Sequence, residues 1–260
     1  MTDILQTICD YARERVKNYE RETPFSEVKR QALNQKGAGY AFEKAIIKGK
    51  FSLICEIKKS SPSKGVIDPV FDYLKIAADY QEGGADCISC LTEPKWFSGS
   101  DKILSEVVKS VKMPVLRKDF TVSAYQVYQS RLLGASAVLI IMSALKESEA
   151  AAFFEAAEET GLSAVFECRN EEQIERAQKI GARIIGVNNR NLKDFSVDTS
   201  KARMLSSLVD KDRIFISESG VMSVDDLRAQ KLAGADAALV GEYCMRAKDR
   251  AAAVREMKNV

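Results

Sequence analysis

Four similar stretches recur along the chain, and each joins an amphipathic pattern to a short apolar run. They are GADCISCL from Gly84, GASAVLIIM from Gly134, GARIIGVN from Gly181 and GADAALVG from Gly234, spaced by 50, 47 and 53 residues. In each copy the glycine follows a helical pattern, where a left-handed residue typically ends a helix. The run after it, rich in Val, Ile, Leu and Ala, is typical of a strand buried on both faces.

Four further apolar runs lie between these copies, and together they predict eight strands. They are FSLICEIK from Phe51, PVLRKDF from Pro114, SAVFEC from Ser163 and RIFISES from Arg213. The stretches Glu149–Thr160 and Val224–Ala233 predict helices, the second with a helix-start signature of Ser223 followed by Asp226. Strands that alternate with helices at this even period predict an α/β fold, a (β/α)₈ TIM barrel. A doubly wound sheet is the alternative, but it usually carries a G-x-G-x-x-G turn, which this chain lacks.

The first 50 residues stand outside the barrel pattern and predict a helical extension. The expected helices are Asp3–Arg21, Phe25–Asn34 and Tyr40–Lys48. We expect residues 1–50 to pack on a single catalytic barrel domain of residues 51–260. Two positions stay open: the extension covers the bottom of the barrel, or its end near Pro24 and Phe25 covers part of the active-site mouth.

Composition narrows the possible functions. Lys plus Arg number 39 and Asp plus Glu 37, a net charge of +2, which argues against a nucleic-acid binder driven by bulk charge. No apolar run approaches the roughly 20 residues that span a membrane, and the charged N-terminal stretch does not resemble a signal peptide. The six cysteines are too sparse for a disulfide scaffold, and Cys87 and Cys90 lie in an apparent strand, as core residues would. We therefore expect a cytoplasmic protein with no membrane partner.

The chain contains no histidine, which removes the most common acid–base catalyst and the most common metal ligand. Proton transfer would therefore use Lys, Glu, Asp, Cys, Tyr or water.

Charged and amide residues gather where the predicted strands end, which is where barrel enzymes place their catalytic groups. Because strand side chains alternate, Glu56 and Lys58 should lie on the same side of the first strand. Later strands end on Lys118, Glu167, Asn188, Arg190, Glu218 and Glu242. Buried charges need partners, so we expect the lysines and glutamates among them to neutralise one another around the mouth.

The last two strand ends, SESG and VGE, are typical of a phosphate site made of backbone N–H groups. The expected donors are Ser219, Gly220, Gly241 and the amide of Glu242. The polar loop of residues 59–65 is either a flexible exposed loop or a mobile anion-binding lid, in which Ser61 could donate to phosphate. The expected partner is a phosphorylated small molecule.

With these residues in place, the whole chain resembles the indole-3-glycerol phosphate synthase family of tryptophan biosynthesis. The matching segments are CEIKKSSPSKG, CLTEPKWFSGS, PVLRKDF, VFECRN, GVNNRNL, SESGV and LVGEYCM. The resemblance implies a carboxy-lyase whose substrate is 1-(2-carboxyphenylamino)-1-deoxyribulose 5-phosphate. Ring closure, decarboxylation and dehydration would give indole-3-glycerol phosphate. No cofactor and no metal are implied.

The resemblance also implies roles for five catalytic residues. Lys118 matches the general acid that protonates the substrate carbonyl during ring closure, and Glu167 matches the base or acid of the dehydration. Lys58 matches a lysine near the substrate carboxylate that could also act as an acid. Glu56 matches the carboxylate that orients these lysines, and Asn188 matches the amide that positions substrate hydroxyls.

The remaining matches concern substrate binding. Arg190 supports the carboxylate side, and Glu218 is counted with the substrate-binding residues. The phosphate cradle matches Ser61, Ser219, Gly220, Gly241 and Glu242. The apolar walls around the anthranilate ring match Phe120, Leu91 and Pro62. Many relatives have a small residue in place of Glu242, so its backbone contact is carried over and a side-chain role is in doubt; Asn189 receives no role.

Three other functions stay open at this point. A Schiff-base aldolase on the same barrel would use Lys118 as a nucleophile of depressed pKa. A phosphoribosylanthranilate isomerase would share the phosphate site but should lack the N-terminal extension and the EIKKSSPSKG loop. A phosphate-binding or scaffold barrel would bind ligand without turnover. Nothing in the sequence marks an interface, so a monomer is expected.

Overall fold

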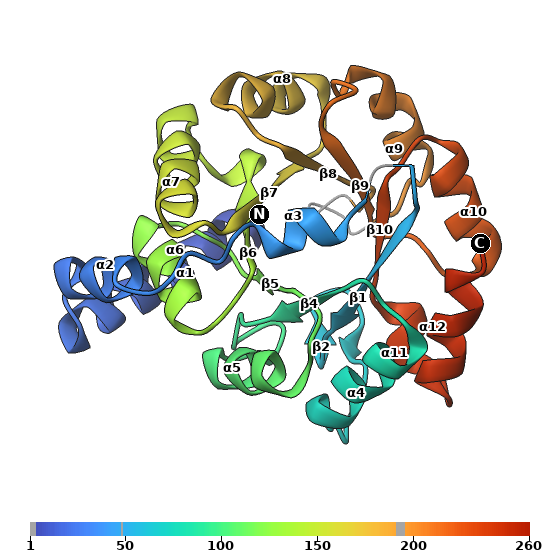
Figure 1. Cartoon of the computed structure of the whole chain (residues 1–260), viewed down its shortest axis with the longest axis horizontal. Helices are drawn as coiled ribbons and strands as arrows, with labels where there is room; N and C mark the ends of the chain where they lie inside the picture. The colour runs from blue at the N-terminus through green and yellow to red at the C-terminus, as the bar shows by residue number, and fades with distance from the viewer. Residues whose placement is uncertain (1–3, 48, 191–195) are drawn as a thin grey trace.

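Eight parallel strands close into a barrel in the structure, a computed structural model that describes residues 4–47, 49–190 and 196–260 (Figure 1). The strands are β1 Ser52–Ile57, β4 Cys87–Leu91, β5 Val115–Lys118, β6 Ala137–Ile141, β7 Ser163–Cys168, β8 Ile184–Asn188, β9 Ile214–Glu218 and β10 Ala237–Val240. They follow one another in chain order around the barrel, and β1 closes it by pairing with both β4 and β10. The predicted (β/α)₈ barrel and its eight strands are confirmed.

Helices connect the strands and form the outer layer (Figure 1). They are α4 Tyr73–Gly83, α5 Asp101–Ser110, α6 Ala124–Leu132, α7 Glu147–Thr160, α8 Glu171–Ile180, α9 Ser200–Leu205, α10 Val224–Leu232, α11 Glu242–Arg246 and α12 Arg250–Lys258, with 3₁₀ turns η1 Met142–Ala144 and η2 Ser206–Leu208. The four repeated glycines all have left-handed backbone, with φ between 84° and 103°, as their helix-ending position predicted. Ser223 accepts a hydrogen bond from the backbone N–H of Asp226 and so caps α10.

The N-terminal segment forms three helices that lie at different places on the barrel. They are α1 Ile4–Glu22, α2 Phe25–Leu33 and α3 Ala41–Ala45. The third is shorter than predicted, because Tyr40 directly before it is left-handed and Ile46 directly after it is extended. The predicted ends Asp3 and Lys48, and residues 191–192 of the GVNNRNL segment, lie outside the described residues.

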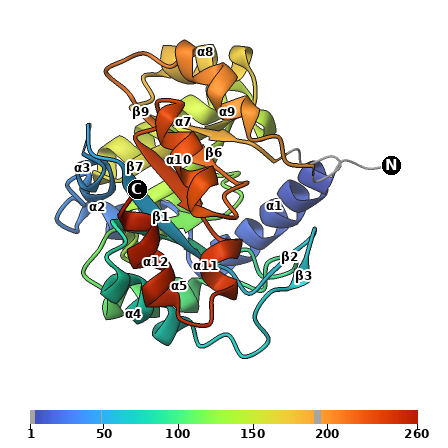
Figure 2. The same cartoon turned by 90° about the vertical axis from the view of Figure 1, so that its right-hand side faces the viewer.

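This segment contacts both ends of the barrel. The amide of Glu43 in α3 donates to Ser163 Oγ at the start of β7, so α3 lies over the bottom. Figure 2 shows α1 at the opposite end, on the side of the short hairpin of β2 Ser60–Ser61 and β3 Gly65–Val66. Phe25 packs edge-on against Tyr128 of α6 on the outer wall, so the residues around it do not cover the mouth.

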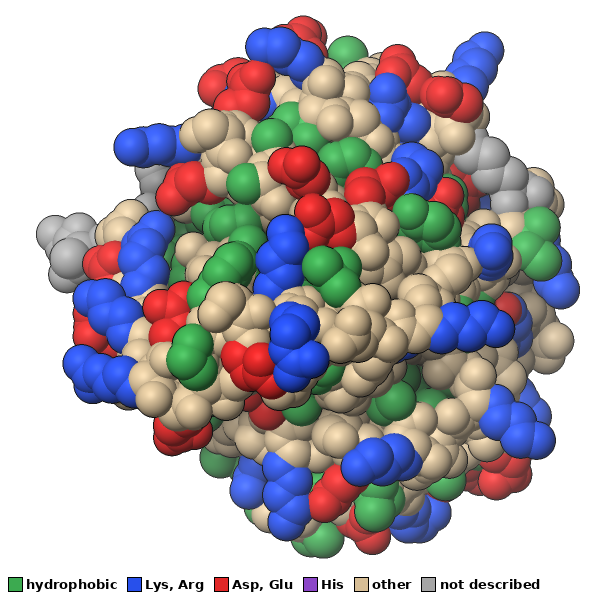
Figure 3. All heavy atoms as spheres, turned by 60° about the vertical axis from the view of Figure 1, so that its left-hand side comes forward, with side chains coloured by type: hydrophobic (Ala, Val, Ile, Leu, Met, Phe, Trp, Pro, Cys, Tyr) green, Lys and Arg blue, Asp and Glu red, His purple; other side chains and the backbone are tan. Residues whose placement is uncertain are grey.

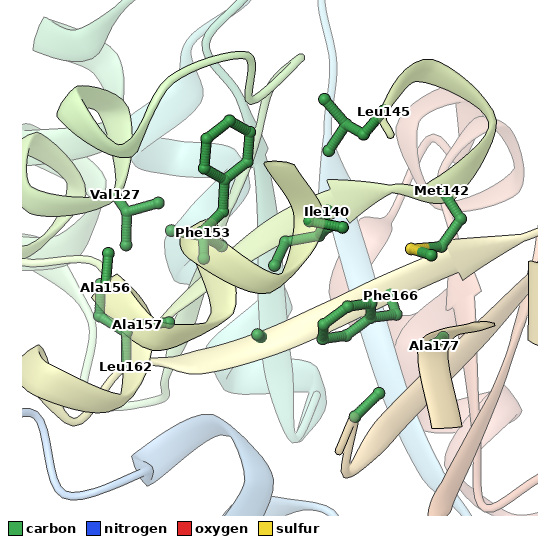
Figure 4. Close-up of a cluster of buried hydrophobic side chains, with 14 of the residues drawn as sticks. Val127, Ile140, Met142, Leu145, Phe153, Ala156, Ala157, Leu162, Phe166 and Ala177 are labelled. Atoms are coloured by element: carbon green, nitrogen blue, oxygen red, sulfur yellow. The ribbon is translucent and has the colours of Figure 1, made fainter. Parts of the chain in front are cut away.

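The hydrophobic core has two layers, one inside the barrel and one between strands and helices. Inward residues such as Leu116, Val165 and Ile216 fill the barrel. Outward residues pack under the helices, as Ile140 and Phe166 do in the cluster of Figure 4. All six cysteines are buried and unbridged, which places Cys87 and Cys90 in the core as predicted.

The surface carries charges of both signs. Figure 3 shows one face on which Lys and Arg are interspersed with Asp and Glu. Among the described residues, no helix is long and apolar enough to cross a membrane. In the same part of the chain, no group of three or more Cys, Asp or Glu side chains is arranged to hold a metal ion.

Candidate active site

A cavity of about 500 Å³ opens at the carboxyl ends of the barrel strands. Every residue that the sequence proposed for the site lines it: Glu56, Lys58, Ser61, Pro62, Leu91, Lys118, Phe120, Glu167, Asn188, Arg190, Glu218, Ser219, Gly220, Gly241 and Glu242. These residues come from seven of the eight strand ends, so the closed barrel is what brings them together. The cavity is large enough for a small organic phosphate.

Lys118 is the centre of the charged group in this cavity. Its Nζ lies 3.1 Å from Oε2 of Glu167 and 3.2 Å from Oε2 of Glu218; both glutamates are buried and the lysine side chain is 14% exposed. Burial disfavours the charged lysine, but the carboxylates of Glu218 and Glu167 outweigh it and raise the pKa of Lys118. The lysine is therefore a protonated donor at neutral pH.

The two carboxylates beside Lys118 differ in their environment. Burial alone would raise the pKa of Glu167, but Lys118 and Arg169, whose Nη2 is 3.4 Å from Oε1, together lower it. Burial raises the pKa of Glu218 to about 7, against the opposing effect of Lys118. Its second oxygen, Oε1, is buried without a hydrogen-bond partner among the described groups. Carboxyls with separated pKa values are typical of acid–base sites.

A glycine makes room for the carboxylate of Glu218. A Cβ on Gly186 of β8 would lie 2.2 Å from Glu218 Oε1, so any larger residue would displace the glutamate. The strand register explains this approach, because Gly186 and Glu218 both point into the barrel from the neighbouring strands β8 and β9.

A second ion pair joins Glu56 and Lys58, as their spacing on β1 predicted. The distance from Lys58 Nζ to Glu56 Oε1 is 2.5 Å. A Cβ on Gly241 would lie 2.7 Å from that same oxygen and 3.2 Å from Lys58 Nζ. The predicted phosphate-side glycine therefore also leaves space for the Glu56–Lys58 pair.

The loop after β1 forms a hairpin that is buried at its first strand and exposed from Lys64 to Val66. Ser60 and Ser61 are buried and pair with β3, and Ser60 Oγ lies 2.8 Å from Ser98 Oγ. Lys64 Nζ lies 3.7 Å from Glu242 Oε1, which connects the hairpin to the end of the neighbouring strand β10. Glu242 also accepts from Arg246, so its carboxylate is held by two cations beside the predicted phosphate cradle.

The residues that follow β9 form a tight turn at the cavity wall. Ser219 and Gly220 both have left-handed backbone, with φ of 66° and 92°. Such a conformation costs a serine roughly 1 kcal/mol or more, so neighbouring contacts must hold it. Gly220 has no space for a side chain, because a Cβ would lie 2.7 Å from Thr199 and 2.8 Å from Val197.

Sequence reasoning missed several residues of the cavity wall. The polar one is Asp119, and the apolar ones are Ile67, Phe97, Leu139, Ile141, Val197, Val221, Met222 and Leu239. Ser63 and Lys64 also line the cavity and belong to the loop of residues 59–65, for which an anion-binding lid was one of the two predictions. The strand alternation that pairs Glu56 with Lys58 could have found Leu139, Ile141 and Leu239, which are inward residues at strand ends. Phe97 belongs to the CLTEPKWFSGS segment but carried no separate signal there.

A buried charge network lies beside Lys118 and connects it to α1. Asp119 accepts a 2.7 Å hydrogen bond from Arg15 Nη2 and a 2.6 Å hydrogen bond from Thr92. Arg117, fully buried, reaches Asp119 and also Asp101 of α5. Helix α1 is therefore bound to the strand end that carries the central lysine.

Comparison with known proteins identifies the family. A family model described as indole-3-glycerol phosphate synthase matches residues 5–257. The chain belongs to the indole-3-glycerol phosphate synthase family. The synthase of Ruminiclostridium cellulolyticum is 44% identical over 98% of both chains, and that of Azospirillum brasilense is 42% identical over 99% of both. The synthase of Endomicrobium trichonymphae is 44% identical over 98% of this chain and all of its own.

Membership in this family settles the enzyme class. Indole-3-glycerol phosphate synthases are carboxy-lyases of tryptophan biosynthesis, so the chain is an enzyme of that class, as predicted. Among solved structures, a 3-hexulose-6-phosphate synthase aligns with a TM-score of 0.63 at 20% identity, covering 80% of this chain and 98% of its own. That likeness shows the barrel fold alone.

Proposed function

We propose that the chain converts 1-(2-carboxyphenylamino)-1-deoxyribulose 5-phosphate into indole-3-glycerol phosphate, carbon dioxide and water. The observation that carries the mechanism is the Lys118 ammonium between two buried carboxylates in the cavity. A protonated lysine of raised pKa is suited to donate a hydrogen bond and then a proton to a carbonyl oxygen that becomes negative.

In the proposed first step, the ring carbon that bears the carboxylate attacks the ketone carbon of the sugar. Lys118 protonates the ketone oxygen as the new carbon–carbon bond forms. Carbon dioxide then leaves, and the electrons of its bond return to the ring system. Lys58, paired with Glu56, binds the substrate carboxylate before it leaves and is a second candidate acid.

Dehydration follows in this proposal. The hydroxyl formed from the ketone leaves as water, the methylene carbon beside the nitrogen loses a proton, and the double bond that completes the indole forms between these two carbons. Glu167, whose pKa is lowered by Lys118 and Arg169 against burial, is ionised at neutral pH and is our candidate base. Asn188 positions the sugar hydroxyls, and Arg190 supports the carboxylate side.

The substrate phosphate is proposed to bind opposite Lys118. Its cradle consists of Ser61, Ser219, Gly220, Gly241 and the amide of Glu242, all of which line the cavity. Backbone N–H groups at strand ends commonly bind phosphate in such barrels. Phe120, Leu91 and Pro62 are proposed as walls for the aromatic ring, together with the neighbouring Phe97.

Product fluorescence tests this proposal, since the substrate and the indole product differ in emission. We expect turnover by the wild type, and a loss of at least ~100-fold in kcat for Lys118→Met and for Glu167→Gln. Circular dichroism and thermal unfolding check that each variant is folded. Near-wild-type kcat in a folded variant would reject the role of that residue.

A Schiff-base aldolase is less consistent with the site. That chemistry needs a neutral lysine of depressed pKa, whereas two carboxylates raise the pKa of Lys118. Borohydride with a keto-sugar phosphate would trap an adduct on an aldolase and leave the synthase unmodified.

The organisation of the molecule completes the proposal. We expect a helical extension of residues 1–50 and one catalytic domain of residues 51–260. A monomer in the cytoplasm, acting without cofactor or metal, remains our prediction. Light scattering would test whether the protein is a monomer, and activity after chelation would test whether it acts without a metal.

A further inference from the structure

Asn189 follows Asn188 at the end of β8, but its side chain does not line the cavity. It is 1% exposed, and both the nitrogen and the oxygen of its side-chain amide form hydrogen bonds. Nδ2 donates to the carbonyl of Ser219 at 3.0 Å and to Ser217 Oγ at 3.2 Å, while Oδ1 accepts from the amide of Ala202 at 3.0 Å. Because Oδ1 has a backbone donor as its partner, the orientation of the side-chain amide is determined.

The backbone of Asn189 is held equally firmly. Its N–H donates to the carbonyl of Glu218, and its carbonyl accepts from the amide of Asp198. Ser217 passes the network on by donating to Gln230 of α10 at 2.7 Å. One residue thus joins the ends of β8 and β9 to α9 and α10, and a fully satisfied buried network of this kind is rigid.

The contact with Ser219 fixes the orientation of a particular peptide group. The Ser219 carbonyl and the Gly220 N–H belong to the same trans peptide, so they point in opposite directions. Asn189 draws the carbonyl away from the cavity, which turns the Gly220 N–H toward it. No acceptor among the described residues takes this N–H.

We infer that Asn189 is a positioning residue that keeps the Gly220 N–H directed into the cavity, where it binds the phosphate of the substrate. This inference rests on the proposed function and adds to it the residue that holds the phosphate cradle in its binding form. The left-handed backbone of Ser219 makes the turn strained, so the peptide needs this contact to stay in place. A flipped peptide would present the Ser219 carbonyl to the anion and repel it.

Substitution by aspartate gives the sharpest test. Asn189→Asp keeps the shape and the acceptor for Ala202, but it puts a carboxylate oxygen against the Ser219 carbonyl and so favours the flipped peptide. Asn189→Ala removes the donor without this repulsion. Asn34→Asp adds the same charge at an exposed site at the end of α2 and is the matched control.

Isotope labelling can follow the Gly220 amide directly. The sequence contains two Ser–Gly pairs, Ser98–Gly99 and Ser219–Gly220, so ¹³C-carbonyl serine with ¹⁵N-glycine selects two amide signals. The Gly99 N–H donates to the carbonyl of Glu93 and serves as an internal reference. We expect inorganic phosphate to shift the Gly220 signal of the wild type and leave the Gly99 signal in place.

The variants should then weaken phosphate binding in a defined order. Loss of one hydrogen bond to a charged group predicts a phosphate Kd roughly 10- to 100-fold higher in Asn189→Asp and a smaller increase in Asn189→Ala. KM for the substrate should rise with it, with kcat changed less. The Asn34→Asp control should keep the wild-type Kd.

Two results would overturn the inference, and they have different consequences. If folded Asn189→Asp or Asn189→Ala binds phosphate with the wild-type Kd while the wild type turns over substrate, the inference fails and the proposed function stands. If the wild type shows no Gly220 shift and no turnover, both fail. Should aspartate prevent folding, Asn189→Ala decides the question alone.

Discussion

Glu218 offers a quantitative test of the electrostatics around Lys118. Its carboxyl is buried. One oxygen forms an ion pair with Lys118, and the other has no hydrogen-bond partner among the described groups. Replacement by glutamine keeps the size of the side chain and removes its charge. The resulting change in the free energy of unfolding depends on pH, because only the glutamate titrates.

The magnitude follows from the pKa of this carboxyl. It is about 7 in the folded protein, against an ordinary value of 4.5 that should hold in the unfolded chain. The stabilisation from the protonated form is therefore complete below pH 4.5 and is lost as pH rises through about 7. At 1.36 kcal/mol per pH unit, wild type should lose about 3 kcal/mol relative to Glu218→Gln across this window.

Thermal unfolding of both proteins between pH 4.5 and 8.5 would measure this difference. With 2–4 °C per kcal/mol for a chain of this size, Tm of Glu218→Gln minus Tm of wild type should grow by roughly 6–12 °C and then level off. Glu175→Gln, at an exposed position of α8, is the control and should give a flat difference. A flat curve for Glu218→Gln, or one that falls with pH, would refute the reasoning that burial dominates at Glu218.

Three further predictions use other parts of the molecule. Gly241→Ala should raise KM at least ~10-fold in steady-state kinetics, because its Cβ would lie 2.7 Å from Glu56 Oε1. An unchanged KM would show that the Glu56 side chain can shift without loss of substrate binding. Arg15→Met should lower the free energy of unfolding by about 3 kcal/mol, because the buried Asp119 loses a charged partner. Breaking an exposed ion pair of α1 should lower it by less than ~1 kcal/mol. All six cysteines should resist iodoacetamide in the native protein, because all six are buried and burial raises the pKa of the Cys90 thiol to about 12. Rapid labelling detected by mass spectrometry would contradict this.

Local signals were sufficient to predict the barrel. Each repeated glycine ends a helix and precedes a buried strand, so the eight strands could be counted without knowing how they pack. The position of the N-terminal helices could not be predicted in this way, because an amphipathic pattern shows that a helix has an apolar face but not which part of the barrel that face contacts. Phe25 is an example: its contact is with Tyr128, a residue far along the chain.

The candidate site was predicted best where charge marked it. Lys118 and Glu167 stand out as charges at the ends of apolar runs. Leu139 was missed because an apolar residue at a strand end looks like any core residue. Asn189 was left without a role because its contacts are with Ser219 and Ala202, and their proximity exists only in the closed barrel.

The placement of α1 and α3 at opposite ends of the barrel constrains how the protein is made. Arg15 bonds to Asp119, which is 104 positions later, and Glu43 bonds to Arg183, which is 140 positions later. At 5–20 residues per second, a ribosome needs roughly 7–28 s to reach the partner of Glu43 after Glu43 itself. The apolar faces of these helices thus stay exposed until their partner segments have been synthesised. Chaperones that bind nascent chains would contact these faces first.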